Sequence, residues 1–204
     1  MIAIIDYGIG NLFSLCSSLK YIGQHAVITG DIRTIESCEK ILLPGVGAFA
    51  DAARKLRTGG LDEAVIREAK KGKPLLGVCL GMQLLFEKSY EFGQYDGLGL
   101  LGGVVLPIKP RIPDYYKIPH IGWNGLLFPN GYKSPLFKYI DEGDHVYFVH
   151  SYHAEQCETD VIAKTEYGAE LTAAVGQGNI FGTQFHPEKS GDIGLNILRA
   201  FAEI

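Results

Sequence analysis

The stretch from residue 73 to residue 88, KPLLGVCLGMQLLFEK, constrains the fold more than any other part of the sequence. It begins as a short apolar run, and from Leu80 onward its apolar residues recur at helical spacing. Cys79 stands at the junction, with Gly77 two residues before it and Gly81 two residues after it. A sharp turn from strand to helix strains the backbone and brings neighbouring strands close, which leaves no room for a Cβ beside the turn. The pattern therefore predicts a nucleophile elbow with a thiol at its tip.

Two effects favour reactivity at Cys79. The N-terminus of the helix stabilises the thiolate, which lowers a cysteine pKa from ~8.5 into the range ~3.5–7.5. The backbone N–H of Leu80 points to where an oxyanion would form. The alternative interpretation is a buried structural cysteine, the usual role of a lone cysteine in a globular protein. The elbow favours an acyl-transferring enzyme.

Composition excludes several other classes of protein. The 204 residues suit one domain spanning 1–204, and the net charge of −4 offers no basic face for nucleic acid. No apolar run approaches the ~20 residues of a membrane span, so we expect no membrane partner. Met1 is followed at once by a strand-like run without a basic leader, which favours the cytoplasm. A reduced cytoplasmic setting also fits the four cysteines, which show no paired spacing: Cys16, Cys38, Cys79 and Cys157.

The order of apolar runs predicts the fold class. Strands at 2–5, 26–29, 40–43 and 75–78 alternate with helical patterns near 12–22 and 61–71, the rhythm of a parallel sheet. Short strands at about 104–107, 118–122, 146–149, 161–164, 172–175 and 180–184 predict a more antiparallel second half, closed by a helix over 192–204. We expect an α/β fold with an open, mixed, mostly parallel sheet flanked by helices.

Two glycine-rich segments follow predicted strands. The G-x-G of residues 8–10 is typical of dinucleotide loops, but Phe13 replaces the third glycine. Asp31 stands near the distance at which such loops are followed by an acidic residue, but it looks like a helix cap. We therefore predict no nucleotide there. The PGVG segment of residues 44–47 has two interpretations, a plain turn between strand and helix or the second donor of an oxyanion hole.

A thiolate needs a base, and the segment QFHPE at residues 184–188 offers one. Two-residue alternation puts His186 and Glu188 on the same side, so Glu188 can orient the imidazole that serves Cys79. Triads are recognised by geometry and not by chain order. The sequence therefore predicts a Cys79–His186–Glu188 triad.

The remaining histidines do not form a metal pattern. His145 and His150 are separated by an odd number of residues along one strand, so they face opposite ways, and no acid or thiol at ligand spacing joins them or His153. We expect no metal and no cofactor. His25 and His120 are interpreted as structural histidines.

GVCLGMQ, FHPEKS, PGVG and DYGIGN together resemble the class I (triad) glutamine amidotransferases, a family with a flavodoxin-like fold. DYGIGN, IPHIGWN, VYFVHSY and GTQFHPEKSG are more selective and are similar to the glutaminase subunits of imidazole glycerol phosphate synthases. The resemblance covers nearly the whole chain. It implies that Cys79 attacks the side-chain amide of glutamine, with His186 moving protons and Glu188 supporting it. It also implies an oxyanion hole from the N–H groups of Val46 and Leu80.

The resemblance implies further roles for residues outside the triad. Gly45 and Gly47 would let the oxyanion loop reorient, and the substrate contacts would be Gln83, Ser151 and Tyr152. The partner would be a (β/α)8 barrel synthase subunit that receives ammonia and makes imidazole glycerol phosphate and an aminoimidazole carboxamide ribotide for histidine biosynthesis. The residues facing the barrel would be Asn11, Trp123, Asn124 and Lys189. A core aromatic is an equal interpretation for Trp123, and a solvated lysine is one for Lys189.

Phe13 departs from the pattern, because many members of the family carry a basic residue there. Three alternatives follow from the sequence. Paralogous glutaminases that feed other acceptor synthases, for example in surface-sugar amidation, would share the same thiol chemistry. A cysteine peptidase or chaperone-like hydrolase would share the elbow but not the HPE segment or Gln83. A non-catalytic binding module would have no need of an intact triad.

Overall fold

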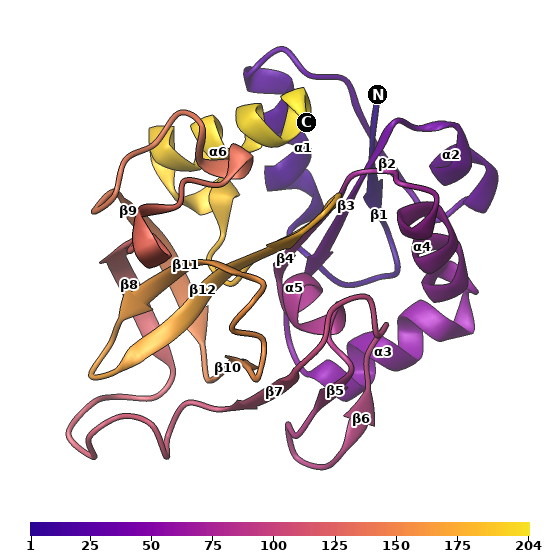
Figure 1. Cartoon of the computed structure of the whole chain (residues 1–204). Helices are drawn as coiled ribbons and strands as arrows, with labels where there is room; N and C mark the ends of the chain where they lie inside the picture. The colour runs from indigo at the N-terminus through magenta and orange to yellow at the C-terminus, as the bar shows by residue number, and fades with distance from the viewer.

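The computed structural model describes residues 1–204, apart from the side chain of residue 130. Across these residues the largest sheet has seven strands, ordered β11-β12-β13-β4-β3-β1-β2. Figure 1 shows this sheet crossing the middle of the molecule. The strands are β1 (Ile2–Ile5), β2 (Ala26–Thr29), β3 (Lys40–Gly45), β4 (Leu75–Cys79), β11 (Val161–Glu166), β12 (Glu170–Gln177) and β13 (Ile180–Thr183).

The sheet is parallel from β13 to β2 and antiparallel from β11 to β13. The pairing of β13 with β4 places Thr183 opposite Val78, one residue before Cys79. On the other side of β4, Gly45 at the end of β3 lies opposite Cys79. The carboxyl ends of three strands distant in sequence therefore meet at the elbow, which is where parallel α/β sheets bind their ligands.

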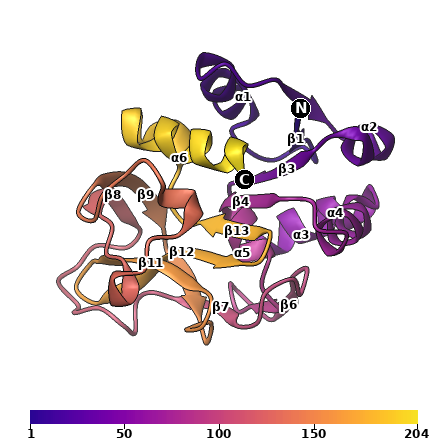
Figure 2. The ribbon, with the colours of Figure 1, turned by 45° about the horizontal axis from the view of Figure 1, so that its top comes forward.

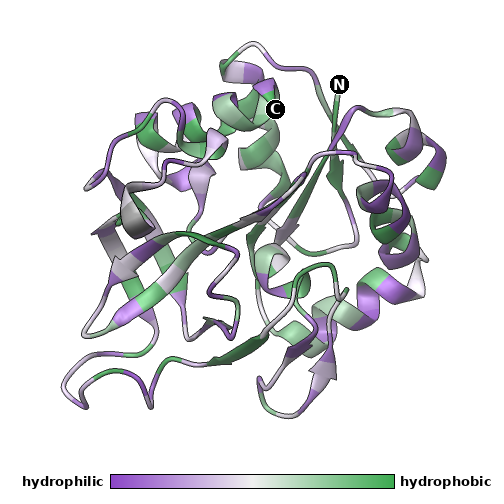
Figure 3. Ribbon diagram, viewed as in Figure 1, coloured by the Kyte–Doolittle hydropathy of each residue, from purple (hydrophilic) through white to green (hydrophobic). Residues whose placement is uncertain are grey.

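Helices cover both faces of the sheet, because successive residues of each buried strand point to opposite faces. Ile2 and Ile4 pack in one cluster with α1 (Leu12–Tyr21) and α6 (Gly191–Glu203), and Figure 2 shows these two helices together on one side of the central strands. Ala3 and Ile5 pack in the cluster that holds the helices of the opposite face. Those helices are α2 (Ile32–Ser37), α3 (Phe49–Thr58), α4 (Leu61–Lys70) and α5 (Leu80–Leu84). The central strands are hydrophobic along their length in Figure 3, as this burial requires.

Two smaller sheets and three short 3₁₀ turns complete the described structure. One sheet has the order β10-β7-β5-β6 and the other pairs β8 with β9. Their strands are β5 (Lys88–Ser89), β6 (Tyr95–Asp96), β7 (Val104–Pro107), β8 (His120–Gly125), β9 (His145–His150) and β10 (Tyr152–Glu155). The turns are η1 (Pro129–Gly131), η2 (Pro135–Phe137) and η3 (Pro187–Lys189).

The predicted α/β class, the parallel first half and the antiparallel second half are confirmed. Asp31 caps α2, since its carboxylate accepts a hydrogen bond from the backbone N–H of Thr34. The predicted strand at 118–122 starts later, at His120, because Pro119 has no N–H for a ladder. No pattern in the sequence predicted α3, β5, β6 or β10. None of the helices in the described residues is long and apolar enough to cross a membrane.

Candidate active site

The elbow joins β4 directly to α5. Cys79 has φ 54° and ψ −111°, a conformation with positive φ that is costly for a residue with a Cβ. Its side chain is nearly buried, at 7% exposure. Strain of this kind persists only where the surrounding structure holds it, and here the flanking strands of a parallel sheet do so.

The glycines around Cys79 are required by close backbone packing. A Cβ on Gly77 would lie 2.6 Å from the carbonyl oxygen of Gly81, and one on Gly81 would lie 1.8 Å from that of Leu43. Gly45 differs from its expected role, since it is buried at the end of β3, where a Cβ would lie 2.7 Å from the backbone nitrogen of Gly81. Gly45 therefore lets the elbow approach β3. Gly47, with φ 87° and open space around it, is the position with conformational freedom.

A hollow of about 290 Å³ opens beside the elbow. Cys79 and His186 line it together, so a thiol and an imidazole from opposite halves of the chain share one small pocket. The remaining lining residues are Val46, Gly47, Leu80, Gln83, Glu91, Pro119, Val149, His150, Ser151 and Tyr152.

The predicted contact between His186 and Glu188 is present. The two atoms His186 Nδ1 and Glu188 Oε1 are 2.8 Å apart, and both side chains are at most 2% exposed. The contact is made across the 3₁₀ turn η3 rather than along a strand, because β13 ends at Thr183. Asn11 donates its amide to the same carboxylate oxygen at 3.3 Å. The second oxygen, Oε2, is buried and has no hydrogen-bond partner among the described residues.

The electrostatics of this arrangement favour a charged imidazole. Burial alone would lower the pKa of His186, but hydrogen bonding to Cys79 and Glu188 and the negative charge of both outweigh it and raise the pKa to about 9. His186 is therefore protonated at neutral pH, poised as a proton donor next to the thiol.

Two glutamines connect the thiol to the wall of the pocket. Gln184 is fully buried, and its amide Nε2 lies 3.8 Å from Cys79 Sγ. Its oxygen accepts a hydrogen bond of 3.0 Å from the amide of Gln83, which also donates to the Tyr152 carbonyl at 3.2 Å. Gln184 was not among the predicted site residues, although it precedes His186 by the same two residues that separate His186 from Glu188.

Glu91 is a second pocket residue that was not predicted from the sequence. It follows β5 and is the only acidic side chain among the described residues lining this pocket. Its carboxylate accepts a hydrogen bond of 2.6 Å from the backbone N–H of Phe49, the first residue of α3. The sequence around Glu91 holds no motif that would have singled it out.

The segment that carries Val46 leaves β3 at Gly45. Tyr7 supports its base, donating its hydroxyl proton to the Pro44 carbonyl at 2.7 Å. Burial, and then the charge of Cys79, raise the pKa of Tyr7, so the hydroxyl stays protonated as a donor. Val46 itself is 41% exposed and lines the pocket. The order of strand, loop and pocket is the one that the oxyanion-donor interpretation of PGVG requires.

Two of the predicted partner-facing residues lie on the surface. Trp123 is 52% exposed and stacks edge to face on Tyr147 at 5.9 Å, and the Lys189 ammonium lies 5.8 Å from the centre of the same ring. Asn11 and Asn124 instead make internal hydrogen bonds, Asn11 to Glu188 as described and Asn124 to the carbonyl of Glu166 at 2.9 Å. Their role in an interface stays a prediction.

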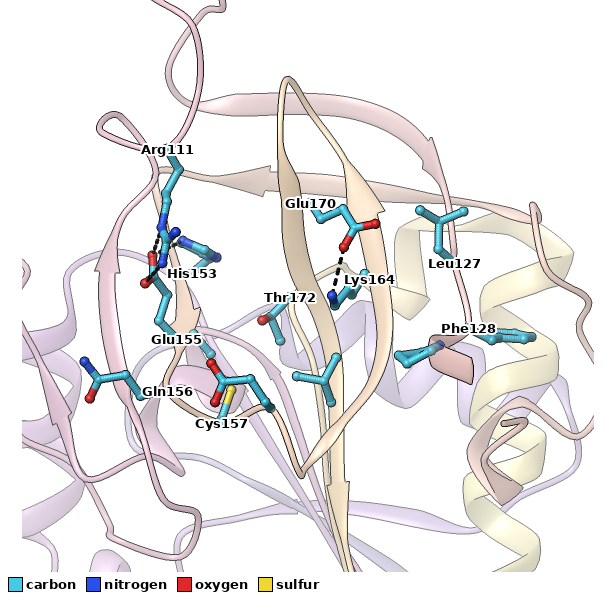
Figure 4. A pocket seen from close by; sticks show the side chains of 14 residues that line it. Arg111, Leu127, Phe128, His153, Glu155, Gln156, Cys157, Lys164, Glu170 and Thr172 are labelled. Atoms are coloured by element: carbon cyan, nitrogen blue, oxygen red, sulfur yellow. Dashed lines mark hydrogen bonds and ion pairs between the residues drawn. The ribbon is translucent and has the colours of Figure 1, made fainter. Parts of the chain in front are cut away.

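A larger hollow, of about 610 Å³, lies between β10, β11 and β12 (Figure 4). Four of its charged groups form two ion pairs, Arg111 with Glu155 and Lys164 with Glu170. Its thiol, Cys157, has its pKa raised to about 12 by burial and neighbouring acids, so it is not a nucleophile. The chemistry therefore belongs to the smaller pocket.

The fold and the elbow define the class of this protein. The model of the glutamine amidotransferase class-I family matches residues 3–203. A crystal structure of a glutamine amidotransferase superposes with a TM-score of 0.75 at 19% identity, covering 99% of this chain and 100% of that one. The structure of PurLQS from Thermotoga maritima superposes with a TM-score of 0.73 at 20% identity, covering 99% and 97%.

Relatives of higher sequence identity show to which group within this class the chain belongs. The imidazole glycerol phosphate synthase subunit HisH of Wolinella succinogenes is 49% identical over 206 residues, with both chains fully covered. The HisH subunit of Caldanaerobacter subterraneus subsp. tengcongensis is 50% identical over 205 residues, covering 100% of this chain and 98% of its own. The chain belongs to the class-I glutamine amidotransferases and, within them, to the family of these HisH subunits.

Proposed function

We propose that this chain is the glutaminase subunit of an imidazole glycerol phosphate synthase, acting in histidine biosynthesis as one domain of residues 1–204. The observation that carries the proposal is a strained thiol, Cys79, in one small pocket with His186, whose far ring nitrogen is held by Glu188. Identity of about one half to HisH subunits along the full chain supports the pathway.

The geometry supports a two-step hydrolysis. Cys79 Sγ attacks the side-chain amide carbon of glutamine, and His186 gives its proton to the departing nitrogen, so that ammonia leaves and a thioester remains. Water then attacks the thioester while His186 takes back a proton, and glutamate leaves with the thiolate restored. The N–H groups of Leu80 and Val46 stabilise the oxyanion in both steps, and one such donor is worth about 10²–10³ in rate.

The pocket offers complementary groups for the rest of the substrate. The Glu91 carboxylate provides negative charge for the α-amino group of glutamine. Gln83, one turn into α5, and the Ser151–Tyr152 backbone complete the wall that holds the side-chain amide. Glu91 thereby joins the substrate residues expected from the sequence.

The ammonia would pass to a (β/α)8 barrel synthase subunit bound over Asn11, Trp123, Asn124 and Lys189. Confinement matters because ammonia released into neutral water is mostly protonated and loses its nucleophilicity. The aromatic and cationic cluster of Trp123, Tyr147 and Lys189 supplies the residue types that anchor interfaces. We place the complex in the cytoplasm, in keeping with thiols that stay free in the described structure.

The variant Cys79→Ala tests the proposal in the reconstituted complex. We expect glutamine-dependent synthesis to vanish while synthesis from added ammonium salt continues at the wild-type rate. Cys157→Ala, at the inert thiol of the larger hollow, is the matched control and should retain both activities. Equal loss of the glutamine and ammonium activities in Cys79→Ala would contradict the proposal.

The identity of the partner needs its own test, because a glutaminase subunit that serves another acceptor synthase would share the same thiol site. Affinity capture of the tagged chain from its native cell, followed by mass spectrometry, identifies the synthase that copurifies. Capture of a barrel subunit of imidazole glycerol phosphate synthase supports the assignment. Capture of a different amidating synthase favours the paralogous function.

A further inference from the structure

Two buried histidines contact each other behind the wall of the active pocket. His120 on β8 and His150 on β9 are direct partners in the strand register, and His120 Nδ1 lies 3.0 Å from His150 Nε2. Their side chains are almost excluded from solvent, with exposures of 0% and 6% for the two residues. His150 also lines the pocket that holds Cys79 and His186.

The outer nitrogens of the pair face two oxygens. His150 Nδ1 lies 2.9 Å from the carbonyl oxygen of Tyr152, and His120 Nε2 lies 2.9 Å from the side-chain oxygen of Asn124. Both oxygens only accept, so each of these nitrogens must carry a proton. The contact between the rings requires one more. The arrangement therefore needs three protons, whereas two neutral imidazoles carry two.

The orientation of the Asn124 amide controls this count. Its oxygen faces His120 because its Nδ2 donates to the Glu166 carbonyl at 2.9 Å. If the amide turns over, its NH₂ group donates to His120 Nε2, and two protons satisfy every contact from Asn124 to Tyr152. In that state the bond from Asn124 to the Glu166 carbonyl is given up, and one proton passes from His120 Nε2 to solvent beside the half-buried Asn124.

The surroundings favour the neutral pair. The His120 ring is stacked between the Phe148 and Tyr167 rings, at 4.9 Å and 4.0 Å. Burial is the main cause that lowers the pKa of His120, opposed by its bond to Asn124. Burial likewise lowers the pKa of His150 to about 3.

The ionisable groups around the pair also favour its neutral form. Those that face His150 are His120, His153 of β10 and His186, which are cationic when protonated. No carboxylate contacts either ring among the described residues, and the nearby Glu166 carboxylate accepts from the backbone N–H of Gly168. A cationic pair would therefore lack a counter-charge.

We propose that Asn124, His120 and His150 form a proton-linked relay, in which the orientation of a half-buried amide on β8 sets the charge of a buried histidine pair beside the active pocket. The neutral pair, with the NH₂ group of Asn124 facing His120, is the resting state. A contact at the surface that holds the Asn124 oxygen toward His120 loads a third proton onto the pair. Because positive charges at His150 and His186 repel each other, this third proton makes His186 lose its own proton more easily.

This last consequence rests on the proposed function, whereas the proton count does not. The test uses the full chain with ¹⁵N-labelled histidine, in which long-range ¹H–¹⁵N spectra give the protonation of each ring nitrogen. In the wild type at pH 7.5 we expect His120 Nε2 to be unprotonated and His120 Nδ1 and His150 Nδ1 to carry the two protons. Asn124→Asp supplies an acceptor that cannot donate, so the pair should keep three protons to a pH higher by about 2. Asn124→Leu, which neither donates nor accepts, should stay at two.

Equal proton counts in the wild type and Asn124→Asp, or three protons in the wild type at pH 7.5, would overturn the proposal. Should Asn124→Asp fail to fold, the wild type still decides the matter on titration toward acid. The Asn124 side-chain NH₂ resonances should then shift with the same midpoint as His120 Nε2, and independent midpoints would refute the coupling. Proton counts as expected in a wild-type chain that shows no glutaminase activity in the reconstituted complex would count against the proposed function alone.

Discussion

Replacing Glu188 by glutamine tests the electrostatic basis of the candidate site with little change of shape. The glutamine oxygen can accept from His186 Nδ1 as Glu188 Oε1 does at 2.8 Å, so the hydrogen bond remains but loses its charge. Its NH₂ group takes the place of Oε2, which already lacks a partner among the described residues. One unpaired buried atom replaces another, and we expect the folded structure to persist.

The expected size of the effect follows from the change in one hydrogen bond. A bond to a charged group contributes about 1.5–3 kcal/mol, and a neutral one about 0.5–1.5 kcal/mol. The difference, on the order of 1.4 kcal/mol, corresponds to a tenfold change in proton affinity. The pKa of His186, raised to about 9 in the wild type, should therefore fall to about 8 in Glu188→Gln.

The pH dependence of glutamine hydrolysis by the complex measures this shift. His186 must be protonated to donate to the departing nitrogen, so kcat/KM should decline with a midpoint near 9 in the wild type and about 8 in the variant. Glu170→Gln, which removes an exposed acid beside Lys164, should leave the midpoint unchanged. A midpoint that stays in place or rises in Glu188→Gln would refute the reasoning.

Three further changes have defined outcomes. Gly81→Ala should lower the free energy of unfolding by about 3 kcal/mol or more, measured by urea denaturation, because its Cβ would lie 1.8 Å from the Leu43 carbonyl; wild-type stability would contradict the packing argument. Tyr7→Phe leaves the buried Pro44 carbonyl without its donor and should cost about 1–3 kcal/mol in the same assay, an unaltered urea midpoint being the contrary result. Glu91→Gln should raise KM for glutamine about 10-fold to 100-fold with little change in kcat, since a charge-assisted bond is lost; an unchanged KM in steady-state assays would exclude the contact.

Stability should also depend on pH through His186. Its pKa is raised from 6.5 to about 9 on folding, so the contribution is fully present below pH 6.5 and is lost as the pH rises through 9. The unfolding midpoint in urea should therefore fall between pH 6.5 and pH 9 in the wild type. In His186→Gln that dependence should disappear, and its persistence would assign it to another group.

The elbow was predictable because its causes are local. An apolar run, a cysteine between two glycines and a helical pattern lie within a few residues, and each glycine meets backbone atoms of the elbow or its neighbouring strand. The buried position of Gly45 was not predictable. A side chain is excluded there by the backbone nitrogen of Gly81, which lies 36 positions away along the chain. A turn signal and a close-packing requirement look identical in a sequence.

Contacts between residues far apart in the sequence were the other feature that the sequence could not predict. The pairing of β13 with β4 brings the segment of His186 to Cys79. The sequence pattern predicted which residue types are needed, but not how close they lie in space. Glu91 reaches the pocket from a loop without a motif. Helix α3 was missed because no side-chain cap marks its start within the described residues, where Ala48 precedes it.

The short segment that carries Val46 is tethered at both ends. Gly45 is wedged against the elbow at one end, and the Phe49 N–H is bound to the Glu91 carboxylate at the other. That carboxylate is also the group proposed to receive the substrate's amine. When glutamine binds, its amine would compete with the Phe49 N–H for the Glu91 carboxylate. The loop that carries the oxyanion donor would therefore be held less firmly in a filled pocket than in an empty one.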